Sequence, residues 1–152
     1  MILLHILWPT FALVLLIFVV WSVLLAQRVR HLRATPPRAE DLATRSGAQR
    51  YFEPIEMPAN NLSNLFEIPV LFFALVPLLM GTQQAGIAQV ALAWVFVILR
   101  AVHSWIHIGP RNVRARAQVY IASTAVLAAM WIGFFIDFAS AAAVYASAVA
   151  QP

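Results

Sequence analysis

The chain has 152 residues, of which 62% are hydrophobic and 11% charged, and its formal net charge is +4. A soluble domain of this size cannot bury so much apolar surface in one core, so this composition and a mean hydropathy of +0.82 indicate a lipid bilayer. The absence of cysteine excludes disulfides, thiolate metal ligands and a cysteine nucleophile.

Four apolar stretches of about 20 residues, the length that crosses roughly 30 Å of hydrocarbon, predict four membrane-spanning helices. They cover residues 7–27, 61–80, 88–108 and 116–138. The first stretch has no basic leader and is longer than the apolar core of a signal peptide, so we expect it to be retained as a helix. Together the four helices predict a single integral membrane domain over residues 1–152.

Arginine is distributed unevenly over the segments that connect these helices. All ten basic residues are arginines, and six of them lie in the segment 28–60, whereas the turn 81–87 has no charge. Because positively charged loops stay in the cytoplasm, we expect 28–60 to be cytoplasmic and both termini to be non-cytoplasmic. The same placement explains the pI near 10.7 without nucleic acid as a partner. The proline-punctuated part of this loop, 34–59, is either a lid over the charged end or a flexible linker.

Polar and ionisable side chains occur inside or at the edge of three spans and gather near one end of the membrane. They recur at helical spacing on one face of each helix: Asn60, Asn64 and Glu67 on the second span, Arg100, His103 and His107 on the third, Arg116 and Tyr120 on the fourth. A charge inside a span costs roughly 2.5–3.5 kcal/mol on insertion scales, so this cluster predicts mutual pairing or a polar ligand. Pro69 predicts a kink beside Glu67 that frees the carbonyl of Leu65.

Each of these groups also has a purely structural interpretation. Glu67 and Arg100 have the charges of a buried ion pair that would fix the helix register, and Asn64 suits a polar contact between helices. The two histidines and Tyr120 suit the membrane interface as hydrogen-bonding or aromatic groups. A metal site is not predicted, because HxxxH without an accompanying H-E-x-x-H base is a loose pattern.

Three runs of sequence carry a resemblance to a known family. They are Asn64-Leu-Phe-Glu67, Arg100-Ala-Val-His103-Ser-Trp-Ile-His107 and Asn112-Val-Arg-Ala-Arg116-Ala-Gln-Val-Tyr120. With four spans in this order, the chain resembles the MAPEG superfamily, the membrane-associated proteins in eicosanoid and glutathione metabolism, over essentially its whole length. The resemblance implies an up-down left-handed four-helix bundle, a homotrimer in a bacterial inner membrane, and glutathione as a co-substrate held between subunits near the cytoplasmic side. The small residues Ala125, Ala129 and Gly133 suit such close helix packing.

The resemblance also implies a role for each polar group. The residues implied in glutathione binding are Asn60, Asn64, Glu67, Arg100, His103 and His107. Among them, Glu67 faces the amino group of glutathione. Arg116 approaches the sulfur as a catalytic residue, because a guanidinium stabilises a thiolate and the thiolate is the nucleophile. Tyr120 follows on the same face as the second catalytic residue, and an apolar second substrate enters from the lipid.

The sequence departs from the eicosanoid-forming members at four positions. Asn60 and Ser63 stand where those members carry an arginine-rich segment, so two charge contacts to glutathione carboxylates are missing. Ala117 replaces a serine of the prostaglandin-forming branch, and His107 replaces a tyrosine. We therefore predict neither prostaglandin nor leukotriene synthesis, and the chain is more similar to generic bacterial-type members.

Three functions remain open on the sequence. The first is a glutathione-dependent transferase or peroxidase that acts on lipophilic electrophiles or lipid hydroperoxides. The alternative is a non-catalytic trimer that binds lipid or serves as an accessory subunit of a larger membrane complex, which the missing arginines favour. A proton-linked carrier or channel is disfavoured, because the charges gather at one end and no polar path crosses to the other.

Overall fold

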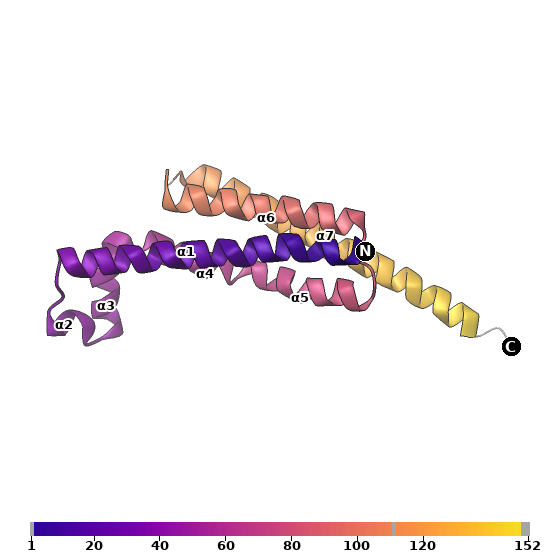
Figure 1. The fold of residues 1–152 in the computed structure, drawn as a ribbon, viewed down its shortest axis with the longest axis horizontal. Helices are drawn as coiled ribbons and strands as arrows, with labels where there is room; N and C mark the ends of the chain where they lie inside the picture. Colours follow the sequence, from indigo (N-terminus) through magenta and orange to yellow (C-terminus); the bar gives the residue numbers. More distant parts are fainter. Residues whose placement is uncertain (1, 111, 150–152) are drawn as a thin grey trace.

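The computed structural model describes residues 2–110 and 112–149, and the regular elements in these residues are all helices (Figure 1). In chain order they are the 3₁₀ segment η1 (Ile2–Ile6), α1 (Leu7–Ala34), α2 (Ala39–Leu42), α3 (Arg45–Phe52), the 3₁₀ segment η2 (Glu53–Ile55), α4 (Met57–Leu65), α5 (Ile68–Gly81), α6 (Ile87–Ile108) and α7 (Val113–Val149). The stretches long and apolar enough to cross a membrane are Leu4–Ala34, Met57–Gly81, Ile87–Ile108 and Val113–Val149. The predicted all-α fold with four membrane-spanning segments is therefore confirmed.

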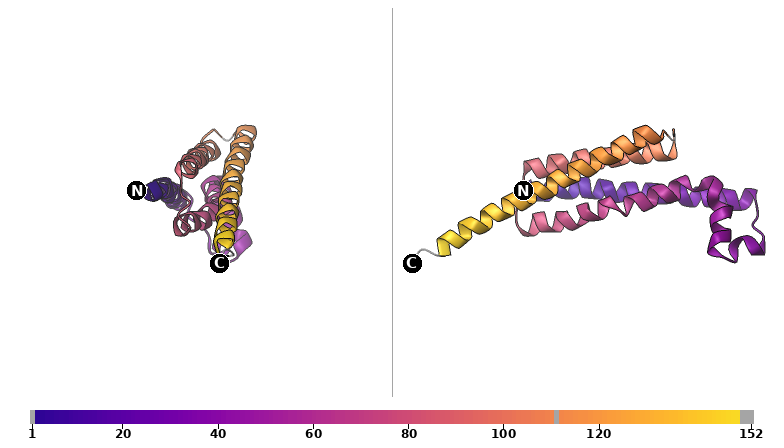
Figure 2. Two further views of the ribbon diagram at one scale, coloured as in Figure 1. Left: turned by 90° about the vertical axis from the view of Figure 1, so that its right-hand side faces the viewer. Right: turned by 180° about the vertical axis from the view of Figure 1, so that it is seen from behind.

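The long helices lie lengthwise beside one another. The N-terminus and the turn between α5 and α6 lie at one end of the molecule, whereas α2, α3 and the link from α6 to α7 lie at the other (Figure 1). Viewed along the helices, α1 and α7 occupy opposite sides, with α5 and α6 between them (Figure 2). α6 agrees with the predicted span 88–108 to within one residue, and it packs against α1, α4 and α7. It therefore contacts each of the other three spanning segments.

Two predicted spans, 7–27 and 116–138, are shorter than the helices that contain them. α1 continues to Ala34 because its last turns consist mainly of good helix formers, and it ends close to Pro36, whose ring disfavours helical backbone before it. α7 continues to Val149 through an alanine-rich stretch. This 37-residue helix is about 55 Å long at 1.5 Å per residue, so its last part projects from the bundle (Figure 1).

The second span, predicted at 61–80, is two helices rather than one. α4 and α5 are separated at Phe66 and Glu67. Pro69 lies in the first turn of α5, where a proline is tolerated, and it has no N–H to donate to the carbonyl of Leu65. The predicted kink beside Glu67 is confirmed, and it places this carboxylate at the junction between α4 and α5.

The connection 28–60 was expected to be a loop, but it is largely helical. It contains the end of α1, then α2, α3 and η2, and the start of α4. The hydroxyl of Tyr51 donates to the carbonyl of Thr35, and Nε2 of His31 lies 3.0 Å from the carbonyl oxygen of Tyr51. These contacts pack the connection against the end of α1, which argues against a flexible linker.

The buried core consists of aromatic and branched aliphatic side chains from all four spans. Phe72 of α5 stacks on Phe96 of α6 with ring centroids 5.2 Å apart, and both are fully buried. Gln89 Nε2 donates to the carbonyl of Met130 at 3.0 Å in the interior and so joins α6 to α7. Lipid tails are as apolar as these side chains, so close packing and hydrogen bonds, rather than transfer out of water, hold the helices together.

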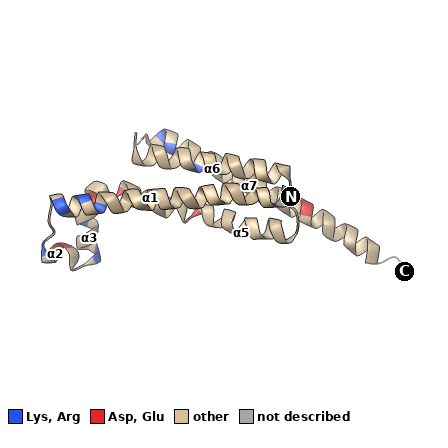
Figure 3. Ribbon diagram, in the orientation of Figure 1, with Lys and Arg blue, Asp and Glu red and all other residues tan. Residues whose placement is uncertain are grey.

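The outer surface is apolar along the bundle and charged at one end. Most arginines gather at the end away from the N-terminus, as the sequence predicts (Figure 3). Ala125 and Ala129 of α7 are exposed in the protomer. A Cβ atom on Gly133 would lie 3.3 Å from Nε2 of Gln89, so this glycine packs within the protomer instead.

We expect Leu75→Ala to destabilise the protomer and Leu71→Ala, one turn away on the same helix, to have little effect. Leu75 is fully buried, whereas Leu71 is 47% exposed. Loss of the buried side chain leaves a cavity, and the expected cost lies at the low end of the ~2–5 kcal/mol typical of buried Leu→Ala changes, because lipid adds little transfer energy. Unfolding in a denaturing detergent, followed by circular dichroism, measures both variants. Equal losses would contradict the assignment of Leu75 to the core.

Candidate functional site

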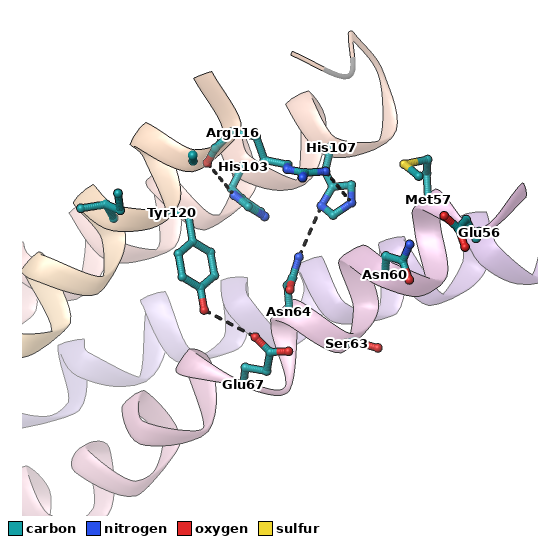
Figure 4. A pocket seen from close by; sticks show the side chains of 12 residues that line it. Glu56, Met57, Asn60, Ser63, Asn64, Glu67, His103, His107, Arg116 and Tyr120 are labelled. Atoms are coloured by element: carbon teal, nitrogen blue, oxygen red, sulfur yellow. Dashed lines mark hydrogen bonds between the residues drawn. The ribbon is translucent and has the colours of Figure 1, made fainter. Parts of the chain in front are cut away.

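A cavity of about 660 Å³ opens between α4, α6 and the start of α7, near the arginine-rich end of the molecule (Figure 4). Its lining residues are Glu56, Met57, Asn60, Ser63, Asn64, Glu67, His103, His107, Arg116, Ala117, Tyr120 and Ile121. This volume lies within the range of about 300–1,000 Å³ that is usual for small-molecule sites. The lining combines two carboxylates, a guanidinium, imidazoles and amides with a few apolar groups.

The structure brings most of the sequence-predicted site residues to this cavity. The predicted residues that line it are Asn60, Asn64, Glu67, His103, His107, Arg116 and Tyr120. Three separate spans contribute them, so the helical stripes of the sequence do converge. Arg100 is the exception, because it lies beneath the cavity rather than in its lining.

Arg100 is fully buried at 0% exposure, and its guanidinium holds the helix junction together. Its Nη2 atom donates to the backbone carbonyl of Asn64 at 2.6 Å, and its Cζ atom lies 5.3 Å from the ring centroid of Tyr120. The carbonyl that receives a side-chain donor at the break is therefore that of Asn64 rather than the predicted one of Leu65. Arg100 thus connects the end of α4 to α7 and positions two groups of the cavity.

The ion pair between Glu67 and Arg100, one structural interpretation of these charges, is not formed. In the part of the chain that the structure describes, the only ion pair joins Arg38 and Glu40 at 3.7 Å. Glu67 is exposed to the cavity, and its Oε2 atom accepts a hydrogen bond from the hydroxyl of Tyr120 at 3.5 Å (Figure 4). The helix break explains this arrangement, because it turns Glu67 away from the buried arginine. The carboxylate therefore keeps an oxygen free for a ligand.

His107 lies between Asn64 and Arg116. Its Nδ1 atom is 3.4 Å from Nδ2 of Asn64, and its Nε2 atom is 3.3 Å from Nη1 of Arg116. A neutral imidazole has one donor and one acceptor nitrogen, and a guanidinium only donates. Both contacts are hydrogen bonds when Nε2 accepts from Arg116 and Nδ1 donates to the side-chain oxygen of Asn64, with that amide turned by 180°. His107 then orients the guanidinium at the cavity.

His103 occupies the floor of the cavity and is almost fully buried. Its Nδ1 atom lies 3.3 Å from the backbone carbonyl of Arg116, to which a ring N–H donates. Its ring also packs against the rings of His107 and Tyr120, with centroids 5.6 Å and 5.5 Å away. His103 therefore joins α6 to the first turn of α7 and fixes the positions of Arg116 and Tyr120 in the cavity wall.

The start of α7 positions Arg116 through a local cap. Asn112 Oδ1 accepts from the backbone N–H of Ala115 at 3.1 Å, and the carbonyl of Asn112 accepts from the N–H of Arg116 at 3.0 Å. A side-chain oxygen that satisfies a free N–H at a helix start is the usual N-cap contact. Asn112 in the run before Arg116 is thus explained by helix initiation, and it leaves the guanidinium free to reach the cavity.

Sequence reasoning did not predict Glu56, Met57 or Ile121 as site residues. Glu56 and Met57 lie one turn before Asn60, on the same helix face as Asn60 and Asn64. The predicted span began at residue 61, so the turn that contains them was assigned to the preceding loop. Ile121 follows Tyr120 and was assigned to the membrane. Of the connection 34–59, Glu56 and Met57 alone line this cavity, so most of it is not positioned as a lid.

The chemistry available in the cavity is that of charge and hydrogen bonding. Glu67 offers an acceptor to a cationic group, Arg116 offers a donor to an anionic group, and Asn60 and Asn64 offer amide donors and acceptors. Within residues 2–110 and 112–149, no three His, Cys, Asp or Glu side chains are arranged to hold a metal ion. The arrangement suits a zwitterionic or anionic organic ligand.

We expect Arg100→Lys to destabilise the protein although it keeps the charge. A lysine cannot both donate to the Asn64 carbonyl and cover the Tyr120 ring, and its ammonium loses more hydration on burial. An unsatisfied buried carbonyl costs about 1–3 kcal/mol. Arg114→Lys, at an exposed arginine of α7, is the matched control and should be neutral. Detergent unfolding of both variants checks the prediction, and similar stabilities would argue against a role for Arg100 at the junction.

Comparison with known proteins identifies the family of the chain. A family model described as the MAPEG family matches residues 6–136, a segment that contains all the residues lining the cavity. No match was found among curated proteins or among solved structures. The matched segment reaches into all four spanning segments and covers most of the chain. The chain therefore belongs to the MAPEG family and is an integral membrane protein.

Proposed function

We propose that the protein is a membrane-bound, glutathione-dependent transferase or peroxidase that acts on lipophilic electrophiles or lipid hydroperoxides. One observation carries the proposal. Glu67 and Arg116, of opposite charge, line the same cavity from different helices without forming an ion pair with each other. Two unneutralised charges at membrane depth are costly, and a ligand that carries both charges offsets that cost. Membership of the MAPEG family supports glutathione as that ligand.

The cavity residues fit a small peptide thiol. Glu67 would bind its ammonium group, the amides of Asn60 and Asn64 would bind peptide groups or a carboxylate, and Arg116 would face the sulfur. When bound, glutathione supplies the thiolate nucleophile of the reaction. The task of Arg116 is to stabilise negative charge at the sulfur, and His107 keeps the guanidinium in place. Tyr120 orients Glu67 and has a hydroxyl proton to donate.

A lipophilic second substrate would reach the site from the membrane. Ile121 lines the cavity and is 66% exposed, and Phe66 at the helix junction is 62% exposed. The cavity thus has an apolar edge beside its charged groups. An apolar electrophile or a lipid hydroperoxide would partition along this edge and meet the thiolate without crossing water.

The assembled form belongs to the same proposal. We infer a homotrimer of up-down left-handed bundles, each a single domain over residues 1–152, in a bacterial inner membrane with both termini non-cytoplasmic. The exposed small residues Ala125 and Ala129 on α7 support close approach of another protomer. The cavity is open beside this helix, so a second protomer would complete its wall.

One observation favours a different function, a non-catalytic trimer that binds lipid or serves as an accessory subunit. Among the cavity residues in the described part of the chain, Arg116 is the only arginine, since Asn60 and Ser63 occupy the α4 stripe. Two carboxylates of glutathione would then share few cationic partners. Glutathione affinity decides between the two functions, because the accessory role does not need it.

We expect native mass spectrometry in mild detergent to show three copies of the chain. Two features favour assembly: the face of small residues on α7, and a cavity that a single protomer leaves open. Ala129→Phe should disrupt the assembly, whereas Ala143→Phe, on the projecting part of α7, should not. A folded monomer as the sole species of the wild-type protein would refute a site shared between subunits.

We expect Arg116→Ala and Glu67→Gln to fail in different ways. Loss of the guanidinium should lower turnover roughly 10- to 100-fold and move ionisation of the bound thiol to higher pH, because a neighbouring cation favours the thiolate. Loss of the carboxylate should chiefly weaken glutathione binding, by about 10-fold, since it removes a charge-assisted partner of the amine. Calorimetric titration with glutathione, thiolate absorbance against pH and thiol transfer to an aromatic electrophile measure these effects.

Arg114→Ala serves as the control, because this arginine precedes Arg116 by two residues and lies outside the cavity. Its affinity and turnover should match the wild type. If Glu67 and Arg116 were only structural, both variants would instead lower the melting temperature alike. If the wild-type protein neither binds glutathione nor forms its thiolate, the enzymatic function is rejected and the accessory or lipid-binding function is retained.

A further inference from the structure

A second hollow lies between α1 and α6, on a face of α6 that the first cavity does not use. It encloses about 300 Å³, and its lining residues are Leu16, Val19, Val20, Val23, Ala101, Ser104, Trp105, Ile108 and Gly109. We call it the α1–α6 groove. α1 and α7 occupy opposite sides of the molecule (Figure 2), so the groove lies away from α7 and the first cavity. Its lining is apolar apart from Ser104.

The groove opens toward the arginine-rich end of the molecule. α1 and α6 run in the same direction (Figure 1), and the groove residues nearest that end are Val23 on α1 and Gly109, which follows the last residue of α6. Beyond Ile108 α6 stops, but α1 continues for three turns. An occupant that enters from the lipid would therefore lie along both helices and then follow α1 alone.

Arg30 lies on α1 where the groove opens. Gln27 and Arg30 continue the α1 face formed by Val20 and Val23, and they line a separate hollow of about 310 Å³ farther along α1. Arg30 is seven residues beyond Val23, or about 10 Å along the helix. Side chains on a helix lean toward its N-terminus, so this guanidinium leans back toward the groove. No acidic residue lies within one turn of Arg30 on α1.

Ser104 adds an unpartnered hydrogen-bonding group to the groove. Its side chain is only 3% exposed, and its Oγ atom has no hydrogen-bond partner in the described part of the chain. A buried serine in a helix commonly donates to the carbonyl four residues before it, but Ser104 does not. A buried hydroxyl without a partner is costly, so an acceptor from the occupant would stabilise this arrangement.

We propose that the α1–α6 groove and Arg30 form one binding site for an anionic phospholipid. An acyl chain occupies the apolar groove, an ester carbonyl accepts the hydrogen bond from Ser104, and the phosphate binds Arg30. The cluster of arginines at the end of α1 selects a lipid with net negative charge over a zwitterionic one.

Fluorescence of Trp105 provides the test, because this side chain lines the groove and is 67% exposed. The full-length protein is reconstituted in phosphatidylcholine nanodiscs in which the fraction of brominated phosphatidylglycerol or brominated phosphatidylcholine is varied over the same range. Bromine quenches tryptophan on contact, and the difference between wild type and Trp105→Phe isolates the signal of this residue. We expect brominated phosphatidylglycerol to half-quench Trp105 at about five-fold lower fraction, which corresponds to ~1 kcal/mol for one arginine near a charged membrane.

Arg30→Gln should abolish this preference, whereas Arg50→Gln, which removes an equal charge from α3 outside both hollows, should keep it. Ala101→Phe should fill the groove and reduce quenching by both lipids. Circular dichroism and melting curves establish that each variant folds. Equal quenching of the wild type by the two lipids would overturn the proposal. So would equal effects of Arg30→Gln and Arg50→Gln, because the preference would then reflect overall surface charge rather than this site.

Discussion

A helix that breaks inside a membrane must find new hydrogen-bond partners for the backbone groups it releases, and Arg100 provides such a partner here. Its guanidinium donates to the Asn64 carbonyl where α4 ends and packs against the ring of Tyr120. One buried side chain thus connects α4, α6 and α7 below the cavity. This hydrogen bond and the aromatic ring offset part of the cost of burying its charge, since Nε and Nη1 of Arg100 have no hydrogen-bond partner in the described part of the chain. The wall of the cavity depends on this contact, because it sets the direction in which Glu67 leaves the helix junction.

The arrangement separates structural charge from charge that is available to a ligand. Arg100 is buried and holds the helices, whereas Glu67 and Arg116 line the cavity and do not neutralise each other. A carboxylate and a guanidinium in an ion pair would have little capacity left for a substrate. Here each has neutral hydrogen-bond partners, Tyr120 and His107, that orient it without cancelling its charge. This is the arrangement expected of a binding site rather than of a device that fixes helix register.

α6 has different chemistry on its two functional faces. His103 and His107 face the cavity with α4 and α7, whereas Ala101, Ser104 and Trp105 face α1. The histidines determine the position of polar groups that suit a water-soluble ligand, and the other face suits lipid. A central helix that contacts all other spans can therefore support a polar cavity on one face and the proposed lipid site on another.

The sequence alone determined the membrane environment, the four spans and the stripes of polar residues. The length of an apolar stretch and its helical periodicity are local properties of the chain. It also located the kink, since Pro69 removes a backbone donor wherever it occurs in a helix. Only the tertiary structure decided which charges meet. Glu67 and Arg100 have opposite charges, so an ion pair was one structural interpretation, but the helix break turns Glu67 toward Tyr120 and leaves Arg100 with a backbone carbonyl. The α1–α6 groove could not be predicted either. Its residues are almost all apolar and carry no motif, and they form a groove only because two helices that are far apart in sequence lie side by side.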